Sequence, residues 1–81
     1  MFYVYLLKSE KDGKHYIGFT SDLRKRFQEH VSGKNRSTFY RRPLKLIYYE
    51  CYTDGDVAKR RETQIKSGKA HTALLKRLGE R

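Results

Sequence analysis

The sequence has 81 residues and a net charge of +10, from 19 Lys and Arg against 9 Asp and Glu. This length is typical of a single small domain over residues 1–81, and the charge predicts an anionic partner, with nucleic acid ahead of an anionic membrane. No apolar run of about 18 residues and no signal-peptide pattern is present, so we expect a cytoplasmic protein. The single cysteine excludes an internal disulfide, and 3 scattered histidines give no structural zinc pattern.

The first predicted element is a β-hairpin. Residues 2–7 are β-branched, aromatic or aliphatic at nearly every position, which is typical of a central strand covered on both faces. Turn residues that include Asp12-Gly13 follow, and residues 15–19 return as the second strand. A four-residue loop would make Tyr5 and Tyr16 diagonal neighbours about 7–8 Å apart on one face. A two-residue turn at the Asp-Gly pair would separate them further.

An amphipathic helix is predicted over residues 22–32, with Thr20 or Ser21 as its N-cap and the following glycine as its stop. Its apolar stripe consists of Leu23, Phe27 and Val31. At about 100° per residue, Arg26 and His30 fall on the border of this stripe rather than on the solvent side. Two polar side chains are therefore expected to lie close to the sheet.

Residues 34–43 are basic with interleaved aromatic residues and end at a proline, which predicts a loop. This composition suits contacts with phosphate groups. The residues expected to contact nucleic acid are Arg36, Tyr40, Arg41 and Arg42.

A third strand is predicted over residues 44–52, with Cys51 as a packed strand residue. The helix that joins the second strand to the third should place the third strand antiparallel to the first, on its far side. The sheet order would then be 2-1-3, which agrees with a first strand that is apolar on both faces.

A second helix is predicted from about residue 54 to 67, with Thr53 or Asp54 as its cap and Gly68 as its stop. Its inward residues would be Val57, Ala58 and Ile65, and Glu62 lies at the edge of that face. Leucines at helical spacing in residues 71–78 predict a short third helix. The order β-β-α-β-α-α gives an α+β domain with a three-stranded antiparallel sheet and two to three packed helices.

Several motif residues follow one another at helix- and strand-compatible spacings. Tyr3-Val4-Tyr5 and Tyr16-Ile17-Gly18 are separated by ten residues. The later members are Phe19-Thr20-Ser21-Asp22-Leu23, Arg26, His30, Ala58 and Arg61-Glu62. This ordered set covers nearly the whole chain and resembles the GIY-YIG nuclease domain. The sequence is similar to the small stand-alone members, which are similar to the N-terminal nuclease domain of an excision-repair protein.

The resemblance implies hydrolysis of a DNA phosphodiester bond with one divalent metal, Mg²⁺ or Mn²⁺. By analogy with the family, Glu62 would bind the metal and Arg26 would hold the scissile phosphate. Tyr5, Tyr16 and His30 would line the site, with one of the two tyrosines activating water. The sequence does not decide which tyrosine does so. The net charge does not distinguish DNA from RNA, so DNA is favoured by the resemblance alone.

Each of these residues also has a structural interpretation. Tyr5 is compatible with a core strand tyrosine, and Arg26 with a solvated helix charge. Glu62 can form an ion pair with Lys66 one turn later, and His30 can act as a charge at the end of its helix. Two further histidines, His15 and His71, are expected at the surface.

Two other functions remain open at this point. In a non-catalytic nucleic-acid-binding module, the net charge and the basic loop would carry binding, and the site would be vestigial. In an adaptor, the chain would dock a partner that performs the chemistry. Because base readout needs an element fitted to a groove, we also expect a partner protein to supply any substrate specificity.

Overall fold

The computed structural model describes residues 1–80, so the last residue of the predicted domain lies outside the described residues. The predicted order of strands and helices is confirmed, with an added 3₁₀ helix, η1. The elements are β1 (Phe2–Ser9), β2 (His15–Thr20), α1 (Leu23–Ser32), η1 (Arg36–Arg41), β3 (Leu44–Tyr52), α2 (Gly55–Lys66) and α3 (Gly68–Arg77). Among residues 1–80 there is no helix with the length and apolar character needed to cross a bilayer.

The sheet is antiparallel with the order β2-β1-β3, as predicted. Tyr5 pairs with Gly18 and Leu7 pairs with Tyr16, which is the register of the four-residue loop. On the other side of β1, the pairing with β3 shifts by one residue between Leu6 and Leu7. The hairpin register therefore places Tyr5 and Tyr16 on one face of the sheet.

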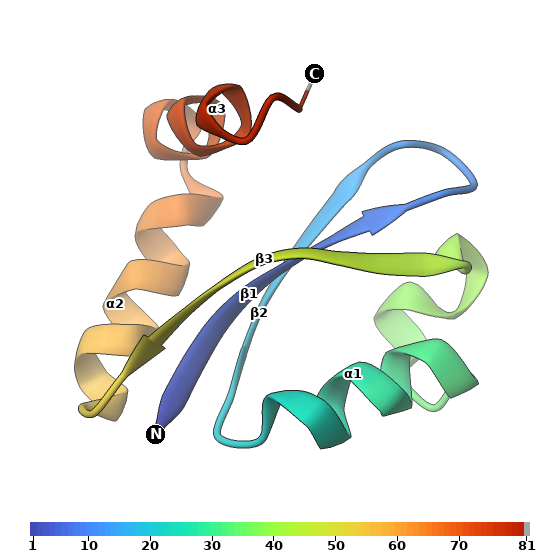
Figure 1. Ribbon diagram of the computed structural model, residues 1–81, viewed down its shortest axis with the longest axis horizontal. Coiled ribbons are helices and arrows are strands. Elements are labelled where there is room, and N and C mark those ends of the chain that lie inside the picture. The colour runs from blue at the N-terminus through green and yellow to red at the C-terminus, as the bar shows by residue number, and fades with distance from the viewer. Residues whose placement is uncertain (81) are drawn as a thin grey trace.

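Helices cover both faces of the sheet, with α2 and α3 on one side and α1 on the other (Figure 1). The core under α2 and α3 contains the buried residues Val4, Leu6, Ile17, Ala58, Ile65 and Leu74. The core under α1 is smaller and contains Tyr5, Leu7 and Leu44, with Tyr16, Leu23, Phe27 and Leu46 packed against it. Alternation of side chains along β1 divides its residues between the two cores.

The helix ends differ from the prediction in two places. Asp22 caps α1, because its side chain accepts a hydrogen bond from the Lys25 backbone N–H; Thr20 and Ser21 are not the cap. Asp54 caps α2 as one of the two predicted candidates. The predicted stop at Gly68 is wrong, because Ser67 adopts an extended conformation with ψ 140° that ends α2 and precedes α3.

The predicted loop over residues 34–43 contains η1, which begins where the Asn35 side chain accepts a hydrogen bond from the Ser37 N–H. Thr38, in the middle of η1, is completely buried. A run of polar and basic residues without periodicity gave no sign of this short helix, because a local cap and the packing of one threonine stabilise it.

Burial also differs from the prediction at several residues. Val31 and Val57 are 51% and 38% exposed. Cys51 is exposed because it lies on the edge strand β3 opposite Tyr3, where the sheet is open to a groove. The side chain of His15 is only 6% exposed, because Glu80 follows α3 back onto β2 and contacts its Nε2 at 3.0 Å.

Candidate active site

Three aromatic side chains meet on the α1 side of the sheet. Tyr5 projects from β1, Tyr16 from β2 and His30 from α1. Their ring centroids lie 6.3 Å apart for the two tyrosines, 5.7 Å for Tyr5 and His30, and 5.2 Å for Tyr16 and His30. The predicted neighbourhood of the two tyrosines is thus confirmed, and the histidine of α1 closes the cluster.

Tyr5 is a core residue as well as a member of this cluster, with 1% of its surface exposed. Burial, followed by the neighbouring Tyr16, raises the pKa of Tyr5 to about 12, although the Arg26 charge acts in the opposite direction. The phenol therefore keeps its proton at neutral pH. Its Oη lies 2.9 Å from the Nε2 atom of His30.

Gly18 makes room for the Tyr5 ring. A Cβ atom at Gly18 would overlap the outer end of the phenol ring, because the ring lies directly over this position of β2. Gly18 has no unusual backbone angle among the glycines of the chain, so close approach is the reason for glycine here. Gly18, the last residue of the Tyr16-Ile17-Gly18 motif, therefore provides the space that the Tyr5 ring occupies.

His30 is completely buried between the sheet and η1. Its Nδ1 atom lies 2.7 Å from the Oγ1 atom of Thr38, which the sequence analysis did not identify as a site residue. Burial, followed by the Arg26 charge, lowers the pKa of His30 below its ordinary value. The imidazole is therefore neutral at neutral pH, which differs from the helix-end charge considered above.

Arg26 lies at the rim of the cluster, and its side chain is 39% exposed. Its Nε lies 3.2 Å from a carboxylate oxygen of Glu29, one turn later on α1. A hollow of about 160 Å³ adjoins it, lined also by Thr20, Ser21, Asp22, Lys25 and Glu29. The positive charge of Arg26 acts to lower the pKa of both Tyr5 and His30, so it reaches the aromatic cluster.

Glu62 lies on α2 and is only 5% exposed. Lys59 Nζ contacts one carboxylate oxygen at 2.7 Å and Lys66 Nζ contacts the other at 3.2 Å, so the ion pair considered above is present and is shared by two lysines. Burial alone would raise the pKa of Glu62, but its hydrogen bonds to the two lysines outweigh burial and lower it. Glu62 is therefore ionised at neutral pH.

Within residues 1–80, no group of three or more His, Cys, Asp and Glu side chains could hold a metal ion. The negative charge of Glu62 nevertheless reaches Tyr5, whose pKa it raises. A metal at Glu62 would thus find fewer than three such side chains within residues 1–80, and its remaining ligands would be supplied by water or substrate.

The four predicted nucleic-acid contacts differ in their surroundings. Arg36 is exposed, and Tyr40 is 78% exposed. Arg41 donates a hydrogen bond from Nη2 to the His15 carbonyl oxygen at 3.1 Å. Arg42 stacks on the Phe39 ring, 4.4 Å from the ring centroid. Arg36 and Tyr40 are thus turned outward, whereas the other two side chains already have partners.

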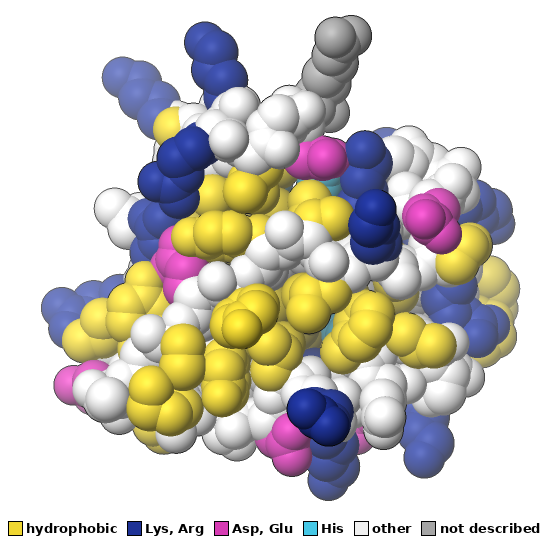
Figure 2. Space-filling model, in the orientation of Figure 1, with side chains coloured by type: hydrophobic (Ala, Val, Ile, Leu, Met, Phe, Trp, Pro, Cys, Tyr) yellow, Lys and Arg dark blue, Asp and Glu magenta, His cyan; other side chains and the backbone are white. Residues whose placement is uncertain are grey.

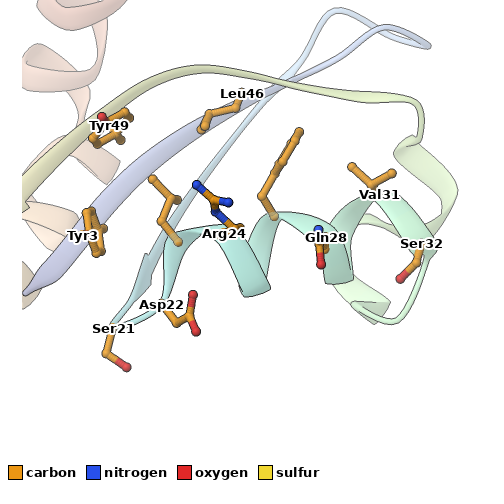
Figure 3. Close-up of a pocket in the computed structure, with 11 residues that line it drawn as sticks. Tyr3, Ser21, Asp22, Arg24, Gln28, Val31, Ser32, Leu46 and Tyr49 are labelled. Carbon is orange, nitrogen blue, oxygen red and sulfur yellow. The ribbon is translucent and has the colours of Figure 1, made fainter.

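An open groove of about 980 Å³ lies between α1 and β3, and Tyr5, Tyr16 and His30 do not line it. Its apolar wall consists of Tyr3, Leu23, Phe27, Val31, Leu46 and Tyr49 (Figure 3). The same region forms a hydrophobic band across one face of the molecule, with Lys and Arg side chains around its margin (Figure 2). Leu23, Phe27 and Leu46 belong both to the groove wall and to the core around Tyr5, so the groove adjoins the aromatic cluster but is not lined by it.

These features define a small α+β domain with two strand tyrosines in contact, an arginine on the first helix and a buried glutamate on the second. Residues 1–76 match the family model described as the GIY-YIG catalytic domain. The chain belongs to this family, which confirms the resemblance drawn from the motif residues. Membership indicates a nuclease that acts on nucleic acid, and nucleases of this family generally depend on a divalent metal.

Similar proteins come from several bacteria. A UPF0213 protein of Bacillus pumilus is 42% identical over 66 residues, which are 80% of this chain and 66% of that protein. A UPF0213 protein of Staphylococcus saprophyticus is 38% identical over 66 residues, 80% of this chain and 79% of that protein. The solution NMR structure of a UPF0213 protein from Bacillus halodurans matches with a TM-score of 0.59 and 32% identity, covering 96% of this chain and 85% of that one.

Proposed function

We propose that this protein is a metal-dependent DNA endonuclease that hydrolyses a phosphodiester bond. The observation that carries the proposal is the cluster of Tyr5, Tyr16 and His30, with Arg26 at its rim, in a chain that belongs to the GIY-YIG family. A cluster of phenols and an arginine, with an ionised carboxylate whose charge acts on Tyr5, suits a reaction in which negative charge develops on a phosphate.

Glu62 is the residue that would hold the metal. Its carboxylate is ionised and its present partners are two exposed lysines, which a divalent cation and its phosphate ligands could displace. Hard cations such as Mg²⁺ or Mn²⁺ accept one carboxylate together with water and phosphate oxygens. When bound, such a cation would neutralise charge on the phosphate. We expect weak binding of the metal in the absence of DNA.

Tyr16 is the better candidate to activate water. It is half-buried, whereas Tyr5 is almost fully buried and has its pKa raised to about 12. A group that takes a proton from water must reach that water and must not hold its own proton too strongly. We therefore assign Tyr5 and His30 to the wall of the site, beside Tyr16.

Arg26 would bind the scissile phosphate. Its partner Glu29 is itself partly exposed, so this surface ion pair can open at little cost. The guanidinium then offers two donors that match two phosphate oxygens and stabilise the charge of the transition state.

The exposed residues of η1 would bind DNA: Arg36 would contact the phosphate backbone and Tyr40 would stack on an unpaired base. We expect weakly specific or structure-selective cleavage of branched, nicked or single-stranded DNA in the cytoplasm, of the kind that DNA repair requires. A partner protein would supply any further specificity, since phosphate contacts carry no sequence information.

The test is cleavage of supercoiled, branched and single-stranded DNA with Mg²⁺ or Mn²⁺ and with EDTA. Wild type should cut only with metal, and Glu62→Gln should lose cleavage while keeping its salt-sensitive affinity for DNA. Glu10→Gln, at an exposed turn position, is the matched control and should cut like wild type. RNA of the same sequences tests the choice of DNA. Cleavage by Glu62→Gln at the wild-type rate would refute the assignment of the metal ligand.

One observation favours a second function. The carboxylate of Glu62 is closed between Lys59 and Lys66, an arrangement that also suits a vestigial site in a nucleic-acid-binding module. That module would bind DNA with strong salt dependence, would not turn over with any metal, and would bind equally well with Glu62→Gln.

A further inference from the structure

A chain of three buried polar groups leads from η1 to the candidate site. Thr38 and His30 are fully buried and Tyr5 is 1% exposed. The Thr38 Oγ1 atom lies 2.7 Å from Nδ1 of His30, and Nε2 of His30 lies 2.9 Å from the Tyr5 Oη atom. Because the His30 imidazole is neutral, only one of its two nitrogens carries a proton.

The chain can therefore run in one of two directions. In the first, Tyr5 donates its hydroxyl proton to Nε2, and the proton on Nδ1 is donated to Thr38. In the second, Thr38 donates its hydroxyl proton to Nδ1, and the proton on Nε2 is donated to the Tyr5 oxygen. Each direction satisfies both nitrogens and leaves one hydroxyl proton, at one end of the chain, without an acceptor.

The position of that remaining proton distinguishes the two directions. In the first direction it belongs to Thr38, whose hydroxyl has no second partner among residues 1–80 and is sealed from solvent. In the second it belongs to Tyr5, which borders Tyr16 and the site. Both hydroxyl groups are buried, and an unsatisfied buried donor is costly; the Tyr5 ring packs against the half-buried Tyr16, so an oxygen of bound substrate can accept its proton there, whereas Thr38 has only His30 as a partner.

Both contacts have normal hydrogen-bond lengths in either direction, so the surroundings of the two hydroxyl groups, and not the distances, distinguish the directions.

We propose that Thr38 is a positioning residue that fixes His30 in the Nε2–H form and thereby leaves the Tyr5 hydroxyl proton free to donate on the site side. The Tyr5 oxygen accepts a hydrogen bond from His30 Nε2–H, and the Tyr5 hydroxyl group donates its proton to an oxygen atom in the site. The role in catalysis rests on the proposed nuclease function, but the direction of the hydrogen bonds does not.

The direct test is long-range ¹H–¹⁵N NMR of the histidine rings, with His30 assigned by its loss in His30→Gln. The wild type should show protonated Nε2 and unprotonated Nδ1. Thr38→Val keeps the side-chain shape without the donor, so the Nδ1–H form should gain population as Tyr5 begins to donate to Nε2. Thr38→Ser keeps the hydroxyl and should retain the wild-type form. A wild-type ring protonated at Nδ1 would overturn the proposal, even if Thr38→Val did not fold.

The same variants are used to measure the kinetics of DNA cleavage. Thr38→Val should lower kcat about tenfold with KM nearly unchanged, as expected for one lost hydrogen bond that acts at the reacting groups, and Thr38→Ser should restore it. Equal kcat in wild type and Thr38→Val would overturn the positioning role. The ring measurement needs no turnover, so absence of cleavage in all variants would refute the nuclease while the NMR result still decides the direction of the chain.

Discussion

The carboxylate of Glu50 on β3 joins α2 to the sheet, and replacing it tests how much this contact stabilises the fold. Arg61 of α2 binds it through two nitrogens, at 2.8 and 2.9 Å. The hydroxyl groups of Tyr48, at 2.5 Å, and Tyr52 donate to the same carboxylate. Burial alone would raise the pKa of Glu50, but these four hydrogen bonds outweigh it and lower the pKa from 4.5 to about 2.

This pKa converts into a free energy of unfolding. A fall from 4.5 to about 2 corresponds to about 3 kcal/mol of stability at pH 7. Removing one partner of a largely buried ion pair costs about 3–5 kcal/mol in other proteins, which agrees. Because the folded-state pKa is the lower one, the stabilisation is complete above pH 4.5 and is lost as the pH falls toward 2. At pH 3 the remaining contribution is roughly 1.4 kcal/mol.

Urea unfolding of wild type and Glu50→Gln at pH 7 and pH 3 tests this value. Glu50→Gln should lower the free energy of unfolding by about 3 kcal/mol at pH 7 and by roughly half of that at pH 3. Glu10→Gln should change it by less than about 0.5 kcal/mol at both. An equal loss at both pH values, or a loss below about 1 kcal/mol at pH 7, would refute the electrostatic account.

Two further predictions concern residues beside the site. Gly18→Ala should destabilise the protein by about 1–3 kcal/mol and reduce cleavage, because its methyl group would displace the Tyr5 ring. Gly68→Ala is the control, because a methyl group there meets open space, and it should be neutral in unfolding and activity assays. Arg41→Ala should lower the unfolding midpoint, since the guanidinium binds a β2 carbonyl group, whereas Arg36→Ala should keep that midpoint and reduce the salt dependence of DNA binding. Equal effects within either pair would contradict these assignments.

The sheet and its register could be predicted from the sequence because both depend on local patterns. The apolar run of residues 2–7 identifies the central strand, and the turn residues limit the hairpin to a few loop lengths. Once the four-residue loop is chosen, Tyr5 and Tyr16 must lie on one face. The crossover through α1 then leaves one position for β3.

The burial of individual side chains could not be predicted in the same way. Val31 belongs to the apolar stripe of α1 but faces the open groove, because α1 covers only part of the β3 side of the sheet. His15 is the first residue of β2, and its burial depends on Glu80, which is distant in sequence. Both outcomes are set by how far one element extends over another, which periodicity does not encode.

Thr38 is the clearest case of a residue without a sequence signal. It stands among basic and aromatic residues in a segment without periodicity, where a surface position is the default expectation. Its burial follows from η1, which packs the threonine against the Nδ1 edge of His30. The sequence placed His30 on the border of a helix stripe, close to the sheet, but gave no indication of its polar partner.

The candidate site shares residues with the smaller core under α1, so a variant at the site can change both activity and stability. Tyr5 fills the space above Gly18, packs under α1 and contacts His30, so its ring is part of the core and its hydroxyl part of the site. Truncating the ring would create a cavity and would lower activity for structural reasons alone. Tyr5→Phe and Thr38→Val remove only hydroxyl groups from the same core. Loss of activity without a comparable loss of stability in these two variants would therefore separate the chemistry of the site from the packing that holds it.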